Sequence, residues 1–182
     1  MRGNIHGVLI LLASAGMSEV HAQDAQSESP PATTVHMEAT LSLPPGVMLR
    51  EILRLHRPSS QTFATLWFWP QNWEEIGWKM GGSLGFISAA PFENSAPIYW
   101  CWGITNWDMF SSLDPNCEGG YRTPDNGPVG FISTVQLPGT TPLYRCVFKW
   151  NGTQWRHFDS LQANCEGVPA VTNDGTLGYV FL

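Results

Sequence analysis

Two tetrapeptides that each begin with Trp and end with Phe combine an indole ring with side chains that bond hydroxyl groups. Trp155-Arg-His-Phe158 and Trp107-Asp-Met-Phe110 correspond position for position. Exposed indoles can stack on the apolar faces of sugar rings. Arg, His and Asp together offer both the donors and the acceptors that a sugar hydroxyl needs. Plain packing of these rings within a hairpin is the competing interpretation. The residues expected to contact a ligand are Trp155, Arg156, His157 and Asp159, with Trp107 and Asp108 as a weaker second copy.

One literal match to a catalytic motif lacks the context that catalysis needs. Gly81-Gly-Ser-Leu-Gly85 fits the G-x-S-x-G nucleophile elbow, in which a serine sits on a strand-to-helix turn. No helical pattern follows Ser83, because the next residues are Phe86-Ile-Ser88 and then Ala-Ala-Pro. The adjacent Glu74 and Glu75 diverge on a helix or a strand, so they do not suit the carboxylate pair of a glycosidase. We therefore expect a protein that is not an enzyme and that carries no cofactor.

Three ordered motifs recur three times along the chain. The closing motif contains Gly85, Gly130 and Gly178, which are 45 and 48 residues apart. Internal periods of this length dictate the fold, since one unit cannot bury its apolar face alone. The opening motif is Ile98–Cys101 and Leu143–Cys146, with a weaker copy at Ile52–Leu55; the middle motif is Phe63–Leu66, Phe110–Leu113 and Phe158–Leu161. The repeats span about 49–88, 97–133 and 142–182.

Each motif is short, rich in β-branched or aromatic residues, and bounded by Gly, Pro, Asn or Asp, as strands are. Asn151-Gly152 between aromatic arms predicts a type I′ hairpin. Met48, Ile52 and Leu55 have helical spacing, but the better second and third copies favour a strand there. The sequence predicts an all-β fold with a pseudo-threefold repeat. A β-trefoil is the leading architecture, and a small three-bladed propeller-like ring is the alternative.

The four cysteines all lie in the second and third repeats. An even number of cysteines in an exported chain suggests disulfides, and three pairings are possible. Where the other repeats have their first cysteine, the first repeat has Leu55, and it also lacks the second one. This paired loss predicts the bonds Cys101–Cys117 and Cys146–Cys165. The competing metal site lacks both Cys-x-x-Cys and His-x-x-x-His spacing, so we expect no metal.

From about Leu49 to Leu182 the chain resembles a family of secreted threefold-repeat modules of unknown function. Tyr144-Arg145, His157-Phe-Asp-Ser160 and Gly178-Tyr-Val180 carry the resemblance best. The second and first repeats depart from it, with Met109 and Thr62 where the third has His157. Modules of this family are often attached to exported hydrolases of bacteria and fungi. The resemblance implies lectin-like binding of carbohydrate or cell-wall material.

Composition and charge exclude several classes of protein. The chain has 182 residues, is 12% aromatic with nine Trp, and is too rich in aromatic residues to be disordered. Its 9 basic and 15 acidic residues give a net charge of −6. A nucleic-acid binder normally carries a basic patch, so we expect no nucleic acid as partner. The length suits one domain with a real core.

The N-terminal segment has the features of an export signal. One Arg, an apolar stretch from Gly7 to Met17, and small residues at Val20 and Ala22 predict a signal peptide over 1–22. This apolar stretch is too short for a membrane span, and no later stretch has the required length. Residues 23–44 are expected to be a flexible leader, followed by a single domain over 45–182.

These features leave two functions from different classes. The first is a secreted, periplasmic or cell-surface module that binds a polysaccharide or other glycan without catalysis. The second is an exported protease inhibitor or protein-interaction scaffold, whose partners would be other secreted proteins. Screening against polysaccharides and against proteases separates the two hypotheses.

Overall fold

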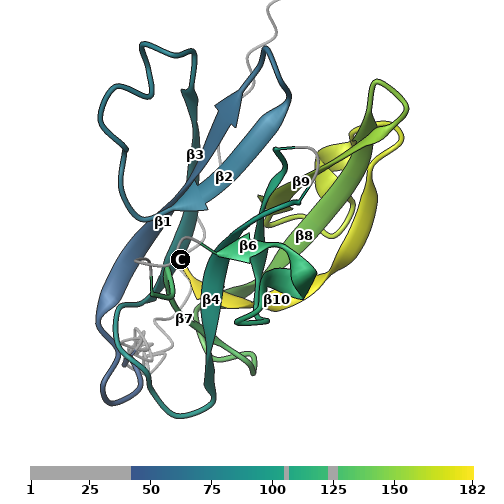
Figure 1. The fold of residues 1–182 in the computed structure, drawn as a ribbon. Helices are drawn as coiled ribbons and strands as arrows, with labels where there is room; N and C mark the ends of the chain where they lie inside the picture. Colours follow the sequence, from purple (N-terminus) through teal and green to yellow (C-terminus); the bar gives the residue numbers. More distant parts are fainter. Residues whose placement is uncertain (1–41, 105–106, 123–126) are drawn as a thin grey trace, which may run out of the picture. The chain divides into compact units, whose positions relative to one another are not determined.

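Short antiparallel strands form the regular structure of the protein (Figure 1). The structure is a computed structural model and describes residues 42–104, 107–122 and 127–182. The predicted signal peptide, 1–22, and residues 23–41 of the predicted leader lie outside these ranges. The strands are β1 (Leu49–Arg57), β2 (Thr62–Leu66), β3 (Lys79–Ser88), β4 (Ser95–Trp102), β5 (Met109–Ser112), β6 (Tyr121–Arg122), β7 (Gly130–Ser133), β8 (Thr140–Trp150), β9 (Gln154–Ser160) and β10 (Thr172–Phe181); Cys117–Gly119 and Cys165–Gly167 form 3₁₀ turns.

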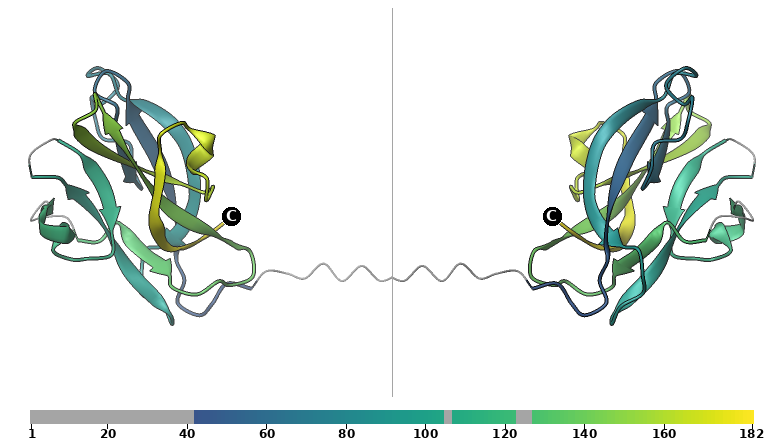
Figure 2. Two further views of the ribbon diagram at one scale, coloured as in Figure 1. Left: turned by 90° about the vertical axis from the view of Figure 1, so that its right-hand side faces the viewer. Right: turned by 90° about the vertical axis from the view of Figure 1, so that its left-hand side faces the viewer.

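Each sequence repeat folds into an antiparallel unit whose first strand lies between the other two main strands. β1 pairs with β2 and β3, β4 pairs with β5 and β7, and β8 pairs with β9 and β10. In the second repeat the short β6 also pairs with β4. In Figure 1 the first repeat, in blue to teal, and the third, in green to yellow, are neighbours where β3 pairs with β10. β8 and β10 run side by side along most of their length (Figure 2).

The predicted hairpin turn at Asn151-Gly152 is present. β8 ends at Trp150 and β9 begins at Gln154. Asn151 has φ 50° and Gly152 has φ 72°, and a type I′ turn needs a positive φ at both central residues. The segment whose apolar residues also have helical spacing is a strand, as predicted, since β1 includes both Ile52 and Leu55.

The main core consists of nine buried residues, three from each repeat. Each position in one repeat has an aliphatic counterpart in the other two, so the core is built from three triplets. Burial of aliphatic side chains is the main favourable term in folding, and no repeat supplies enough of it alone. The triplets are Ile52, Ile98 and Leu143; Leu84, Val129 and Leu177; and Ile87, Ile132 and Val180.

The three closing strands meet through the glycines that mark the repeat. β3 pairs with β10, β10 with β7, and β3 with β7, each through one residue pair. A Cβ on Gly85 would lie 2.5 Å from the carbonyl oxygen of Phe181. A Cβ on Gly130 or Gly178 would lie within 2.7 Å of the carbonyl of Ser88 or Ser133, respectively. Every repeat thus presents a glycine to the backbone of another, and the three contacts form a cyclic set.

The all-β prediction is confirmed, whereas neither specific architecture is. Among the described residues the strand order runs from β2 through β1, β3, β10, β7 and β4 to β5 and does not return to its start. A β-trefoil and a propeller-like ring are both closed, so this open sheet confirms neither of them. No helix in the described ranges has the length and apolar character needed to span a membrane.

The alignment of the first hairpin is wrong by one residue. Leu55 pairs with Ala64, whereas Cys101 and Cys146 pair with Phe110 and Phe158. Ala64 therefore occupies the place that the sequence pattern gives to the preceding phenylalanine. Hairpin register depends on the length and type of the turn, and these turns differ in length. As a result Thr65, not Ala64, corresponds to Ser111 and Asp159.

Both disulfides that the repeat alignment predicts are present. Cys101 is bonded to Cys117 with their Cα atoms 5.4 Å apart, and Cys146 to Cys165 with 5.8 Å. Each bond fixes a 3₁₀ turn to the first strand of its own repeat. Closing loops of this size stabilises a fold by about 3 kcal/mol in the chain-entropy picture.

The glycine contacts predict a sharp difference between two alanine substitutions. Gly85→Ala places a Cβ against the Phe181 carbonyl, at a residue whose φ is +93°. We expect it to lower the free energy of unfolding by about 2–4 kcal/mol. Gly127 has no atom within 4 Å of its built Cβ, so Gly127→Ala should change stability by less than about 0.5 kcal/mol. Urea unfolding of both variants checks this, and equal losses would contradict it.

Candidate functional site

A buried carboxylate lies where the second strands of the three repeats touch. β2, β5 and β9 contact one another, and they bring together the equivalent residues Thr65, Ser111 and Asp159, all buried. Ser111 Oγ donates to Asp159 Oδ2 at 2.5 Å, and Thr65 is the second hydrogen-bond partner of this carboxylate. Burial raises the pKa of Asp159, and the hydroxyl bonds only partly oppose that rise. Asp159 is therefore a structural residue between the repeats.

Two equivalent arginines join neighbouring repeats beside this centre. Arg54 and Arg145 occupy the same position in the first and third repeats and donate to the carbonyl oxygens of Asp159 and Ser111, respectively. Arg54 also forms an ion pair with Glu166, and Arg145 forms one with Glu118 at 2.6 Å. Both glutamates directly follow a disulfide cysteine in the 3₁₀ turn. Each arginine thus fastens the turn of another repeat.

The third junction is built differently. Trp100 stands where the other two repeats have their arginine, since it pairs with Ser111 as Arg145 pairs with Asp159. It packs against Trp73 and Trp102, with ring centroids 6.1 Å and 5.4 Å apart. Apolar packing therefore replaces the ion pair at this junction, and the surfaces between the repeats differ from one another.

One of these junctions contains a surface pocket of about 510 Å³ between the second and third repeats. We call it the acidic pocket, because three carboxylates line it with a single arginine. This volume lies within the range that is typical of small-molecule sites. Its chemical groups are the side chains of Asp108, Glu118, Arg145, Trp155, His157 and Asp174.

His157 is held in place by a buried carboxylate of the preceding repeat. The His157 backbone N–H donates to Asp108 Oδ1 at 3.0 Å, and Nδ1 lies 2.5 Å from Asp108 Oδ2. A carboxylate only accepts, so Nδ1 carries the proton in this bond. The second ring nitrogen, Nε2, lies 3.8 Å from Asp174 Oδ2. The imidazole is fixed in orientation before any ligand arrives.

Arg145 is held between two carboxylates across the same pocket. It lies 2.6 Å from both Glu118 Oε1 and Asp174 Oδ2. Burial acts to raise the pKa of Glu118, but its bonds with Arg145 and Ser112 outweigh burial and lower that pKa below its ordinary value. The pocket thus presents ionised oxygens that can accept from hydroxyl groups, beside guanidinium N–H groups that can donate.

Trp155 supplies the apolar surface of this pocket. The residue is 48% exposed, although its side chain is a large ring on a strand. Lys149 Nζ lies 4.6 Å from the ring centroid, which orients the indole by a cation–π contact. An exposed, oriented indole next to charged hydrogen-bonding groups is the arrangement expected for stacking on a sugar ring.

The six residues predicted to bind ligand do not form one site. Trp155, His157 and Asp108 line the acidic pocket, where Asp108 serves mainly to hold His157. Arg156 is only 2% exposed and, with Trp107, lines a different cavity. Asp159 is 2% exposed at the centre between the repeats. Neighbours on a strand point to opposite faces, so Arg156 cannot share the face of Trp155 and His157.

The sequence interpretation missed Glu118, Arg145 and Asp174. A signal for two of them was present. Arginine recurs in the first and third repeats, at positions 54 and 145. Glutamate follows the second cysteine of the second and third repeats, at positions 118 and 166, so the two pairs are offset by one repeat. That offset is what contacts between neighbouring repeats would produce. Asp174 gave no such signal, because Gly81 occupies its place in the first repeat.

Comparison with known proteins gives no match among family models, curated proteins or solved structures. The resemblance to secreted threefold-repeat modules therefore stays a prediction. In the described ranges, no group of three or more His, Cys, Asp or Glu side chains is placed to hold a metal ion.

The buried carboxylate makes a prediction about pH. Because burial raises the pKa of Asp159, the folded chain keeps its proton where the unfolded chain, with an ordinary value of about 3.9, has lost it. In this range the folded state binds more protons than the unfolded state. The contribution of Asp159 to stability therefore declines as pH rises from that unfolded value through the raised folded pKa. The slope is at most about 1.4 kcal/mol per pH unit. Asp159→Asn should remove this decline.

Urea unfolding at several pH values measures the difference in stability between Asp159→Asn and the parent chain. We expect the variant to become more stable relative to the parent chain as pH rises from the unfolded pKa of Asp159 through its raised folded pKa. Glu93→Gln, which removes an exposed carboxylate, serves as the control for the general effect of replacing a carboxyl group by an amide. A pH-independent difference for Asp159→Asn would contradict the raised pKa.

Proposed function

We propose that the protein is a secreted, non-catalytic carbohydrate-binding module that binds a neutral or amino sugar in the acidic pocket. The observation that carries the proposal is the combination of exposed Trp155 with His157 and Arg145, each fixed by carboxylates. Groups that are already fixed lose little conformational entropy on binding, so they favour affinity for a polar ligand. The ring would stack on the indole while its hydroxyls bond to the carboxylates, Arg145 and His157.

The charge of the pocket supports the choice of sugar class. Asp108, Glu118 and Asp174 outnumber the one arginine, so an anionic sugar would meet repulsion there. A neutral sugar needs only hydrogen-bond partners, and an amino sugar would gain from the excess of carboxylates. This favours neutral and amino-sugar polymers as candidate ligands.

Binding without hydrolysis fits the state of the carboxylates better than catalysis does. A glycosidase needs a general acid whose pKa is raised so that it holds a proton near neutral pH. Glu118 has a lowered pKa and is bound to Arg145. Burial raises the pKa of Asp159, but this carboxyl group does not line the pocket.

Export is the proposal for the location of the protein. Two disulfides fit an oxidising compartment, because thiols stay reduced in the cytosol. The signal-peptide pattern over 1–22 points the same way.

Substitutions in the acidic pocket test the proposal once a glycan array has identified a neutral or amino-sugar ligand. Trp155→Ala removes the stacking surface, and His157→Ala removes one oriented hydrogen-bond partner. Each should weaken binding by about 1–3 kcal/mol in isothermal titration calorimetry. Thermal unfolding of the variants should show that the fold persists.

Trp67→Ala is the matched control for the stacking residue. Trp67 is 47% exposed but lines a separate pocket beside Arg50. Its loss should leave binding unchanged. Equal binding by the parent and both pocket variants would overturn the site, and an array without any neutral or amino-sugar ligand would overturn the function. A positive protease-inhibition assay in that case would favour the alternative scaffold function.

A further inference from the structure

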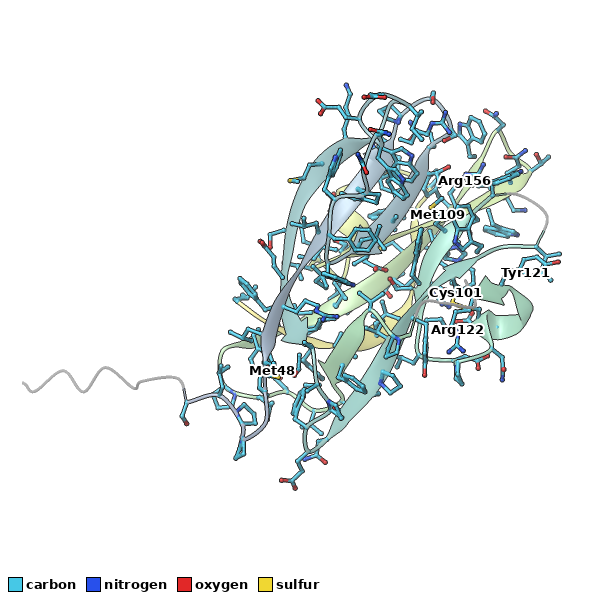
Figure 3. The ribbon with its side chains drawn as sticks, turned by 60° about the vertical axis from the view of Figure 1, so that its left-hand side comes forward. Met48, Cys101, Met109, Tyr121, Arg122 and Arg156 are labelled. Atoms are coloured by element: carbon cyan, nitrogen blue, oxygen red, sulfur yellow. A yellow bond between two sulfur atoms is a disulfide. The ribbon has the colours of Figure 1, made fainter. Side chains whose placement is uncertain are left out.

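A second cavity, of about 490 Å³, lies at the tips of the three hairpins. We call it the tryptophan pocket. The β1–β2, β4–β5 and β8–β9 hairpins all contribute to its wall, as does the segment between β2 and β3. Met109 and Arg156, which both line it, lie close together and far from Met48 in Figure 3. Its aromatic lining is Trp73, Trp78, Trp102, Trp107 and Trp150.

Trp107 is the most unusual of these rings. The residue is 76% exposed, although burying an indole would be favourable. Its φ is +55°, a left-handed conformation that is an outlier for a bulky aromatic residue. Edge contact with Trp102, at 6.2 Å between centroids, leaves most of the ring in solvent. Exposure and backbone strain at one residue point to function.

Arg57 gives the pocket an uncompensated positive charge. Within the described part of the chain its side chain makes no hydrogen bond or ion pair, and its buried Nε has no partner. Buried polar groups are nearly always bonded, so an orphaned guanidinium N–H indicates a missing partner. Arg156 adds a second positive charge, with its guanidinium 5.0 Å from the ring centroid of Trp150. The described residues that line the pocket include these two arginines and no carboxylate.

We propose that the tryptophan pocket is a second carbohydrate site, which binds an acidic sugar whose ring carries a carboxylate. The sugar ring would lie on Trp107, and its carboxylate would accept from the guanidinium of Arg57. Arginine suits a carboxylate because its planar fork can donate two parallel hydrogen bonds. A quaternary ammonium group, which aromatic pockets also take, would be repelled by the two arginines.

This second site has the opposite charge to the acidic pocket and does not depend on it. The acidic pocket has an excess of carboxylates and excludes the ligand that the tryptophan pocket attracts. A chain with both sites could bind a neutral or amino-sugar polymer and an acidic one together. Variants at one site should therefore leave binding at the other intact.

Calorimetry on the full chain with a galacturonate trimer and a hyaluronan tetrasaccharide tests the proposal, each compared with its uncharged methyl ester. We expect at least one acid to bind and its ester to bind less tightly. Arg57→Gln should weaken binding of the acid roughly 10- to 100-fold and abolish the preference over the ester. Trp107→Ala should weaken acid and ester alike, and, because the ring is exposed, it should not affect folding.

Two controls make the result specific. Arg122→Gln removes one positive charge on β6, outside both pockets, and should leave acid binding unchanged. Trp155→Ala disables the acidic pocket and should also leave acid binding at the tryptophan pocket unchanged. Failure of the first site is therefore distinguishable from failure of the second.

Several results would overturn the second site. They are absence of binding by both acids, an equal loss in Arg57→Gln and Arg122→Gln, and full binding by Trp107→Ala. Tighter binding of a glutamate-rich peptide of matched charge would overturn the sugar assignment and indicate a protein partner instead.

Discussion

The close approach of three closing strands is the constraint on which the rest of this structure depends. Gly85, Gly130 and Gly178 each stand so near a carbonyl oxygen of another repeat that a side chain would not fit. Because the backbones touch there, nine aliphatic side chains from all three repeats can pack together around that region. Close packing then leaves no repeat able to fold without the others.

Departures from threefold symmetry are where the candidate sites arise. Two junctions use an arginine that reaches the 3₁₀ turn of another repeat, and one uses Trp100. At the hairpin tips, Arg57 and Arg156 lie among tryptophans contributed mainly by the first two repeats. Identical repeats would give three identical clefts. Divergence at a few junction positions instead gives two pockets of opposite charge without altering the shared core.

The disulfides link the core to the acidic pocket. Each bond fixes a 3₁₀ turn in which a glutamate with a left-handed backbone directly follows the cysteine. Glu118 is thereby held where Arg145 and Ser112 can bond it. The bonds with Arg145 and Ser112 lower the pKa of Glu118, and the disulfide at the adjacent Cys117 fixes the turn that presents it to them.

Sequence alone determined the repeat, the strands, the Asn151-Gly152 turn and both disulfide pairs, because these depend on local periodicity and on equivalence between copies. Only tertiary structure decided which candidate residues meet. Trp155, Arg156, His157 and Asp159 are neighbours in sequence, yet they separate into a pocket wall, a second cavity and the buried centre. Alternation along a strand explains why Arg156 departs from Trp155 and His157. The partners Glu118 and Asp174 come from other segments, and contacts between distant segments depend on how the repeats dock, which no local pattern records.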